Sequence, residues 1–271
     1  MVPERYLALP LIEINHLALT KLYPHTMRSI IAIFFMLPGS LLYGQYHYLG
    51  NAQPLDDQCI LLTPDEPYSE GIAYNTNTID LSNDFYIDFD IYLGNKDEGA
   101  DGITFVMHTD KRGFQAFGTY GECMGYGRWN PEYAFGAFIA PSLAIEFDTY
   151  YNPSQNDPEG DHMAYLENGT NYHFIDVKKP ILPGNLEDDN LHSFILKWNS
   201  SEQILKVWLD DQLRVEVNKD LLNDIFKGNK EVIWGFTAST GRKHNLQYFC
   251  LKRFANLPTH GQQNLAFDLK K

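Results

Sequence analysis

The sequence has little positive charge and little cysteine. Of its 271 residues, 21 are Lys or Arg and 35 are Asp or Glu, which gives a formal net charge of -14. This balance argues against nucleic acid as a partner, because phosphates require Lys and Arg, and against adhesion to anionic membranes. The three cysteines, Cys59, Cys123 and Cys250, are too few for a disulfide framework. A Cys59–Cys250 bridge can form if the first and last strands are neighbours; otherwise all three are free, buried thiols.

A long apolar run of the kind that spans a membrane is also missing. Residues 30–42 are apolar apart from a late Pro-Gly-Ser, and they follow Met27-Arg28. A basic start, a short apolar core and a small-residue exit are typical of a secretory signal peptide, and the run is too short for a membrane span. We therefore expect residues 27–45 to be a signal peptide and residues 1–26 to be a non-native upstream extension. The protein would be secreted or lie at the extracellular surface, with the periplasm as an alternative.

Segments with helical periodicity are scarce, whereas strand-like segments are frequent. Residues 85–93 alternate between apolar and polar side chains, which is the period of a half-buried strand. Further short strands, separated by turn clusters, are predicted at residues 103–107, 142–150, 194–198, 204–209, 213–217, 232–238 and 246–254. One short helix is expected at residues 220–226, before Gly228. The pattern predicts an all-β sandwich of two antiparallel sheets over residues 46–256, followed by a polar tail at 257–271.

One predicted strand and the loop after it carry a concentration of metal-binding side chains. In a strand alternate side chains share a face, so Glu146 and Asp148 lie together, and Asn152 follows beyond the strand end. Asp157 and His162 can add an oxygen and a nitrogen. Hard oxygen ligands suit Ca²⁺, whereas carboxylates with imidazole suit Mn²⁺ or another transition ion. The alternative is an ordinary acidic loop, although carboxylates this close would repel one another without a cation.

The order of these residues resembles the metal-binding signature of legume-type (L-type) lectins, in which E-x-D-x-(aromatic)-x-N is followed by Asp and His. Three other motifs stand in the order found in that family: Ala100-Asp101-Gly102, a glycine loop at 121–126 and the run at 235–241. With the signal peptide and residues 59–63, the chain is most similar to the bacterial secreted branch. The resemblance implies a concanavalin-A-like jelly roll with the cation and sugar sites at one edge of the concave sheet.

The resemblance also implies ligands for two cations. The side chains expected at a transition ion, Mn²⁺ or another, are those of Glu146, Asp148, Asp157 and His162. The ligands expected at Ca²⁺ are Asp148, Asn152, Asp157 and the backbone carbonyl of Tyr150. Asp148 and Asp157 would then bridge both ions. Asp161, beside His162, is a competing ligand candidate, but a solvated side chain is favoured there.

Carbohydrate recognition is the function that the resemblance implies. Asp101, after a cis Ala100–Asp101 bond, and Asn152 would hydrogen-bond sugar hydroxyls with the Gly121 N–H, while the Tyr150 ring stacks on the sugar. The other residues expected at the sugar are Glu122, Thr240, Gly241, Arg242 and Lys243. The partner would be a glycan or glycoconjugate. One shallow site binds weakly, so avidity would need several copies, and an oligomer is possible.

The sequence departs from the family pattern at several positions. Glu122 and Cys123 are unusual neighbours for a sugar, the last strand lacks the common Trp, and residues 163–169 differ from the strand that legume lectins have there. These departures concern the sugar specificity and the transition ion more than the fold. Four lone histidines are expected to be structural or solvated: His108, His173, His192 and His244.

Two other functions are compatible with the same fold. Some β-glucanases with a similar jelly roll use E-x-D-x-E, where the outer carboxylates act as nucleophile and acid/base. Here Tyr150 replaces the second Glu, and no nucleophile elbow or phosphate loop is present, so we expect a binding protein and not an enzyme. A structural or adhesive module without sugar binding is the other alternative. The retained Asp101 and Asn152 argue against it.

Overall fold

The computed structural model describes residues 46–129, 136–174 and 179–257 of the chain. The expected upstream extension and signal peptide, and residues 258–271 of the expected tail, lie outside these ranges. Besides strands, the described ranges contain four short helices, η1 (Gly113–Gln115), η2 (Gly121–Cys123), η3 (Pro153–Gln155) and η4 (Leu221–Ile225). None of these helices is long and apolar enough to cross a membrane.

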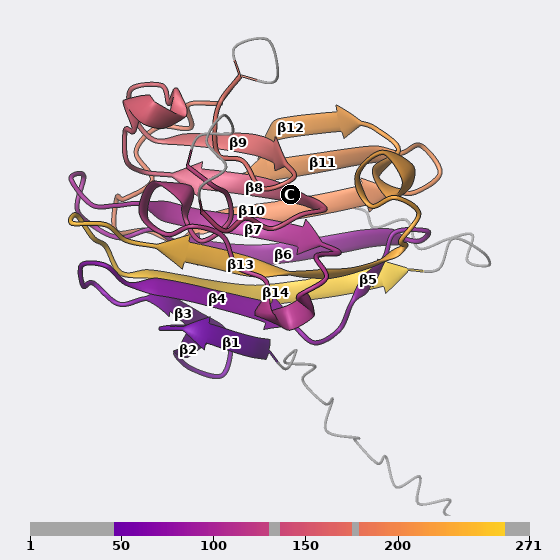
Figure 1. The fold of residues 1–271 in the computed structure, drawn as a ribbon, viewed down its shortest axis with the longest axis horizontal. Helices are drawn as coiled ribbons and strands as arrows, with labels where there is room; N and C mark the ends of the chain where they lie inside the picture. The colour runs from indigo at the N-terminus through magenta and orange to yellow at the C-terminus, as the bar shows by residue number, and fades with distance from the viewer. Residues whose placement is uncertain (1–45, 130–135, 175–178, 258–271) are drawn as a thin grey trace, which may run out of the picture. The chain divides into compact units, whose positions relative to one another are not determined.

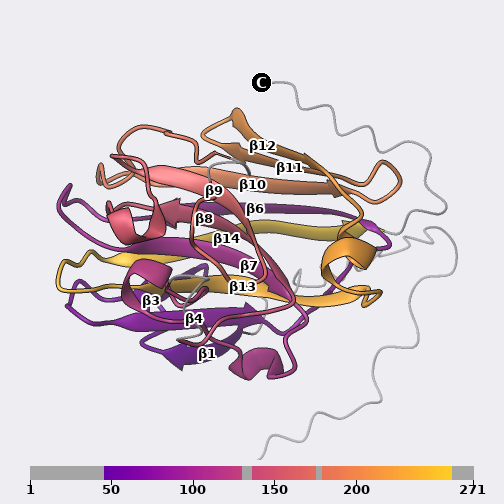
Figure 2. The same ribbon diagram turned by 45° about the horizontal axis from the view of Figure 1, so that its top comes forward.

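The strands form two antiparallel sheets that lie face to face (Figure 1, Figure 2). The front sheet has the order β1-β4-β13-β7-β8-β9, with β5 paired to β13. Its strands are β1 (Tyr46–Gly50), β4 (Glu70–Asn75), β5 (Ile79–Asp80), β7 (Gly102–His108), β8 (Ser142–Asp148), β9 (His162–Glu167) and β13 (Glu231–Ser239). The back sheet has the order β12-β11-β10-β6-β14-β3-β2. Its strands are β2 (Gln53–Pro54), β3 (Cys59–Thr63), β6 (Asp84–Tyr92), β10 (His192–Asn199), β11 (Ile204–Leu209), β12 (Gln212–Asn218) and β14 (Gln247–Leu257). The predicted all-β sandwich is confirmed.

A hydrophobic core fills the space between the two sheets. Strand β6 alternates buried and half-buried residues along its whole length, as its sequence period predicts. Phe89 on β6 lies at the centre, with its ring centroid 4.7 Å from that of Phe236 in the front sheet and 5.9 Å from those of Phe194 and Phe249. Aromatic residues from both sheets therefore hold the sandwich together, because they bury large apolar areas in edge-to-face and stacked pairs.

Strand β8 is buried on both of its faces. Ile145 and Phe147 point into the core between the sheets. The opposite face of the front sheet is covered by loops, whose Tyr126 and Ile139 form a second apolar cluster with Ala144. The even-numbered carboxylates of β8 therefore lie under loops and not in open solvent, which makes this face a place where a charged site can be enclosed.

A disulfide joins β3 to β14 in the back sheet. Cys59 and Cys250 are paired residues of these neighbouring strands, and their sulfurs are bonded at 2.02 Å. Cys123 is a free, buried thiol. The first of the two alternatives for the cysteines is therefore the one that the fold adopts.

The structure differs from the expected elements in a few places. The strand expected at 142–150 ends at Asp148, and the helix expected at 220–226 is a π-helix, η4, whose N-cap Asp220 accepts a hydrogen bond from the Asn223 N–H (3.1 Å). The short strands β1, β2, β3 and β5 were not among the expected ranges, and neither were β4 and β9. Strands β4 and β9 carry no clean apolar/polar alternation, because β4 is buried on both faces and β9 begins inside the site described below.

Candidate functional site

Three strands of the front sheet meet at one end, and the loops there carry the expected site. Gly102 at the start of β7 pairs with Asp148 at the end of β8 and with Ser239 at the end of β13. The Ala100–Asp101 peptide bond before β7 is cis, as predicted. The Asp101 N–H donates to the Ser239 carbonyl (3.0 Å), which fixes the loop against β13. A Cβ at Gly102 would lie 2.1 Å from the Phe147 carbonyl oxygen, so only glycine fits there.

The four side chains expected at the transition ion converge at this end of β8 and β9. The Nε2 atom of His162, the first residue of β9, lies between 3.8 and 4.0 Å from an oxygen of each carboxylate. The carboxylates are those of Glu146, Asp148 and Asp157. All four side chains are buried, with at most 2% of any of them exposed. We call this group the carboxylate–imidazole cluster.

Several oxygens of this region lack a hydrogen-bond partner. Asn171 Nδ2 donates to Oε1 of Glu146 (2.7 Å), and the Asn152 N–H donates to Oδ2 of Asp157 (2.8 Å). Among the described residues, no donor reaches the other oxygens of these carboxylates, Oε2 of Glu146 and Oδ1 of Asp157, or Oδ1 of Asn152. Buried polar atoms are normally paired. The donor set therefore fits cations, with carboxylate and amide oxygens suited to Ca²⁺ and the added imidazole suited to a transition ion.

The electrostatics of the cluster agree with that assignment. Burial raises the pKa of Glu146 and Asp148 well above the usual range, helped for Asp148 by the neighbouring carboxylates. Burial raises the pKa of Asp157 to about 7, and it lowers the pKa of His162 to about 4. The imidazole is therefore neutral at pH 7, which is the form that binds metals. A bound cation would remove the cost of ionising the buried carboxylates.

His173, which was expected to be structural or solvated, lies in the same cluster. Its side chain is 4% exposed, and its Nε2 lies 3.0 Å from Nε2 of His162. It comes from the loop after β9, where no period or motif marks it. Asp161, by contrast, is not part of the cluster. Its Oδ2 accepts a hydrogen bond from the Leu186 N–H (2.5 Å), and it is half-buried, so the expectation of a solvated side chain was wrong.

A groove with a volume of about 860 Å³ lies beside the cluster. It is lined by every residue expected at the sugar: Asp101, Gly121, Glu122, Tyr150, Asn152, Thr240, Gly241, Arg242 and Lys243. Oδ2 of Asp101 is buried and has no hydrogen-bond partner among the described residues. A Cβ at Gly241 would lie 3.4 Å from this oxygen, so residue 241 is in direct contact with the Asp101 carboxylate.

Glu122 adds negative charge to the groove. Its carboxylate accepts hydrogen bonds from Ser154 Oγ and Gln155 Nε2, both at 3.0 Å, which fixes the negative charge near Asp101. Burial, and then the charge of Glu122, raise the pKa of Asp101 to about 7. Thr240 lines the groove, and its buried hydroxyl donates to the Glu66 carbonyl (2.8 Å) and accepts from the Ser69 N–H (2.9 Å), which holds this part of the groove wall in place.

Aromatic rings that the sequence did not single out also line the groove. They are Tyr68, Tyr120 and Trp129, in addition to the expected Tyr150. Each of them is exposed, Tyr68 the most, at 72%. Exposed rings of this kind offer flat apolar faces next to polar groups. The groove therefore has more apolar surface than a single stacking tyrosine provides.

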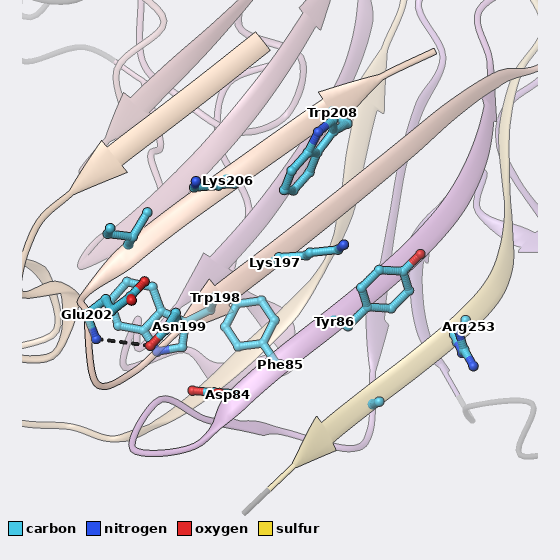
Figure 3. Close-up of a pocket in the computed structure, with 12 residues that line it drawn as sticks. Asp84, Phe85, Tyr86, Lys197, Trp198, Asn199, Glu202, Lys206, Trp208 and Arg253 are labelled. Atoms are coloured by element: carbon cyan, nitrogen blue, oxygen red, sulfur yellow. Dashed lines mark hydrogen bonds between the residues drawn. The ribbon is translucent and has the colours of Figure 1, made fainter. Parts of the chain in front are cut away.

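Another concavity, of about 360 Å³, lies on the outer face of the back sheet (Figure 3). There the ammonium group of Lys197 on β10 lies 5.2 Å from the ring centroid of Tyr86 on β6 and 4.9 Å from that of Trp208 on β11. The cation thus occupies one face of each ring. These aromatics stabilise the exposed sheet face through cation–π contacts and offer less free surface than the rings of the front groove.

The position of Glu146 bears on the hydrolase alternative. Its carboxylate is fully buried in the carboxylate–imidazole cluster and does not line the groove. Tyr150, at the place of the second glutamate of E-x-D-x-E, does line the groove. The described residues of this strand therefore bring no pair of carboxylates to a bound sugar in the way that a retaining hydrolase requires.

Residues 40–253 match the family model described as the legume lectin beta-barrel domain. Among solved structures, a lectin from Bauhinia forficata in complex with GalNAc superposes with a TM-score of 0.65 at 18% identity, covering 82% of this chain and 96% of that one. The basic winged bean lectin with Tn-antigen superposes with a TM-score of 0.60 at 20% identity, covering 76% of this chain and 90% of that one. The exoplasmic/lumenal domain of VIP36, in its Ca²⁺/Man3GlcNAc-bound form, superposes with a TM-score of 0.57 at 17% identity, covering 80% of this chain and 86% of that one.

Proposed function

The chain belongs to the legume lectin domain family, and we propose that it is a secreted lectin that binds glycans through Ca²⁺ and a transition ion without cleaving them. The groove beside the carboxylate–imidazole cluster is the glycan site. Asp101 and Asn152 accept hydrogen bonds from sugar hydroxyls, and the Tyr150 ring packs on the apolar face of the sugar. Glu146, Asp148, Asp157 and His162 hold the transition ion, while Asp148, Asn152, Asp157 and the Tyr150 carbonyl hold Ca²⁺.

The observation that carries this proposal is that the cluster and the groove share one loop. Asp148 accepts a hydrogen bond from the Tyr150 N–H (2.8 Å), and Asp157 accepts one from the Asn152 N–H (2.8 Å). The carboxylates that would hold the cations thus also hold the residues that would touch the sugar. When bound, the cations supply the positive charge that lets these buried carboxylates ionise without mutual repulsion. Glycan binding should therefore depend on the cations.

The aromatic lining supports a partner longer than one sugar. Tyr68, Tyr120 and Trp129 extend the apolar surface of the groove beyond Tyr150. Carbohydrate rings stack on such faces while the rim supplies hydrogen bonds. We therefore propose an oligosaccharide or a glycoconjugate as the partner.

Neighbouring tyrosines provide a matched test of the site. Tyr150 lines the groove and is 37% exposed, whereas Tyr151 is 44% exposed and does not line it. On a glycan array, the Tyr150→Ala variant should lose most of the binding of the unmodified protein, and Tyr151→Ala should keep it. Equal binding by the two variants would contradict the assignment of the groove.

Export from the cytoplasm is the second part of the proposal. Its support is the Cys59–Cys250 disulfide, because disulfides persist in oxidising compartments. Amino-terminal sequencing of secreted material should find a mature chain that begins near Gln45. A secreted chain that retains residues 1–26 would contradict the signal peptide at 27–45.

A further inference from the structure

We propose that His173 is an additional ligand of the transition-ion site, and that the pair of imidazoles makes this site prefer Zn²⁺ or Co²⁺ to Mn²⁺. The inference deepens the proposed function at its transition-ion site. It concerns which ion is bound there and by which atoms. It does not depend on the identity of the glycan.

The position of the His173 ring supports the proposal. Its Nε2 lies 3.0 Å from Nε2 of His162, 3.3 Å from Oε2 of Glu146 and 3.4 Å from Oδ1 of Asp157. An ion bound at about 2.0–2.1 Å from each ligand separates neighbouring ligand atoms by about 3.0–3.4 Å, depending on its geometry. Two sets of three side chains offer donor atoms that lie within 4.8 Å of one another inside each set. The first set is Glu146, His162 and His173, and the second is Asp148, Asp157 and His162. His162 belongs to both sets, and the His173 nitrogen also lies 3.4 Å from Oδ1 of Asp157, so His173 is placed to join the four expected ligands.

A hydrogen bond between the two imidazoles is the simpler explanation of their approach. One ring could donate from Nε2 and the other accept. That arrangement would still leave Oε2 of Glu146 and Oδ1 of Asp157 buried without a donor among the described residues. A cation in the cluster satisfies both oxygens and both nitrogens together, so it accounts for more of what is observed.

Hydrogen bonds hold the ring of His162 and the backbone of His173. Nδ1 of His162 lies 3.3 Å from the Gly160 carbonyl, so an N–H there leaves the lone pair on Nε2. His173 is held through its backbone, because its N–H donates to the Gln155 carbonyl (2.9 Å) and its carbonyl accepts from Asn156 Nδ2 (2.5 Å). The loop that carries His173 is thus tied to η3, the helix next to the proposed Ca²⁺ ligands.

The second nitrogen changes which ion the cluster should select. Imidazole is a favourable ligand for Zn²⁺, Ni²⁺ and Cu²⁺, whereas Mn²⁺ has the lowest affinity among the divalent first-row metals and prefers oxygen. Replacing an oxygen ligand by imidazole therefore increases the preference of the site for Co²⁺ and Zn²⁺ over Mn²⁺. Because the general order already places Mn²⁺ below Co²⁺ and Zn²⁺, the effect of His173 is a wider gap. We expect the ratio of Co²⁺ to Mn²⁺ affinity to be at least tenfold larger in the unmodified protein than in His173→Gln.

The test uses the full chain after removal of metal, titrated with Co²⁺ and then with Zn²⁺ and Mn²⁺ in competition. The visible absorption of bound Co²⁺ reports its ligands. His173→Gln should weaken Co²⁺ and Zn²⁺ binding by 10- to 100-fold, alter the Co²⁺ spectrum and change Mn²⁺ binding little. His244→Gln is the control, because His244 bonds with Asp65 far from these ligands in sequence and outside the cluster. Equal Co²⁺ affinity and spectra for the unmodified protein and His173→Gln would overturn the proposal.

A second measurement uses only the unmodified protein, so it tests the proposal even if His173→Gln does not fold. Proton NMR of the Co²⁺-loaded, unmodified protein should show two strongly shifted, exchangeable imidazole N–H signals, one for each histidine. A single signal would overturn the proposal. Ca²⁺ and glycan binding are measured in the same samples. If two histidines bind Co²⁺ but the protein binds no glycan, the proposed function alone is contradicted. If the protein binds glycan and only one histidine binds Co²⁺, only the present inference is contradicted.

Discussion

The Asp101 carboxylate should lower the stability of the metal-free protein while serving the sugar site. It is 4% exposed, and its Oδ2 has no hydrogen-bond partner among the described residues. Replacing it by asparagine keeps the shape of the side chain and removes the charge. We predict that Asp101→Asn stabilises the metal-free protein at neutral and alkaline pH and weakens glycan binding.

The expected size and sign follow from the pKa. Burial, and then the charge of Glu122, raise the pKa of Asp101 from 3.8 to about 7. Well below pH 3.8 the carboxyl is protonated in both the folded and the unfolded chain, and it costs nothing. As pH rises toward 7 the unfolded chain releases the proton first, so stability is lost. At about 1.4 kcal/mol for each tenfold change in proton affinity, the cost reaches at most about 4 kcal/mol above pH 7.

Urea denaturation in EDTA at pH 4, 6 and 8 measures this difference. Asp101→Asn should exceed the free energy of unfolding of the unmodified protein by less than about 1 kcal/mol at pH 4 and by up to about 4 kcal/mol at pH 8. The exposed Asp57→Asn is the control and should show little difference at any pH. With the cations restored, glycan affinity should fall about fivefold for each hydrogen bond that changes from a charged to a neutral acceptor. A variant less stable than the unmodified protein at pH 8 would refute the reasoning.

Three further predictions concern other parts of the account. Glu122→Gln removes a charge that raises the pKa of Asp101. When glycan binding is measured against pH at saturating Ca²⁺, the pH of half-maximal binding should therefore move to a lower value. An unchanged value would argue against the coupling between Glu122 and Asp101. Asp148→Ala should abolish metal and glycan binding together, as measured by mass spectrometry and on an array, and retained glycan binding would separate the two sites. Cys59→Ser should lower the free energy of unfolding by about 2–5 kcal/mol in urea denaturation, because the Cys59–Cys250 bridge closes a long loop; an unchanged midpoint would show that the bridge does not constrain the unfolded chain.

The sequence predicted much of the fold because half-buried strands have a period of two. Strands β6, β11 and β13 lie within one or two residues of their expected bounds. The unexpected β4 is buried on both faces, so its sequence shows no alternation. The pairing of β3 with β14, which decides the disulfide, is a contact between distant segments that local patterns cannot reveal.

The site was predicted to the extent that its residues are close in sequence. Glu146, Asp148 and Asn152 follow one another on a strand and its loop, where spacing alone places them. His173 reaches the cluster only because its loop bonds back to the Gln155 carbonyl. The aromatic rings Tyr68 and Trp129 enter the groove from loops whose positions depend on the whole sandwich. Such residues need the three-dimensional structure.

The central claim is that glycan binding in the groove depends on cations in the neighbouring cluster. The most direct measurement is glycan-array binding by the purified mature chain before EDTA, after EDTA and after Ca²⁺ with a transition ion is restored. The account predicts binding that EDTA abolishes and the added ions recover. Undiminished binding after EDTA, with no metal detected by mass spectrometry, would contradict the coupling. A folded, metal-loaded chain that binds no glycan would favour the structural or adhesive alternative.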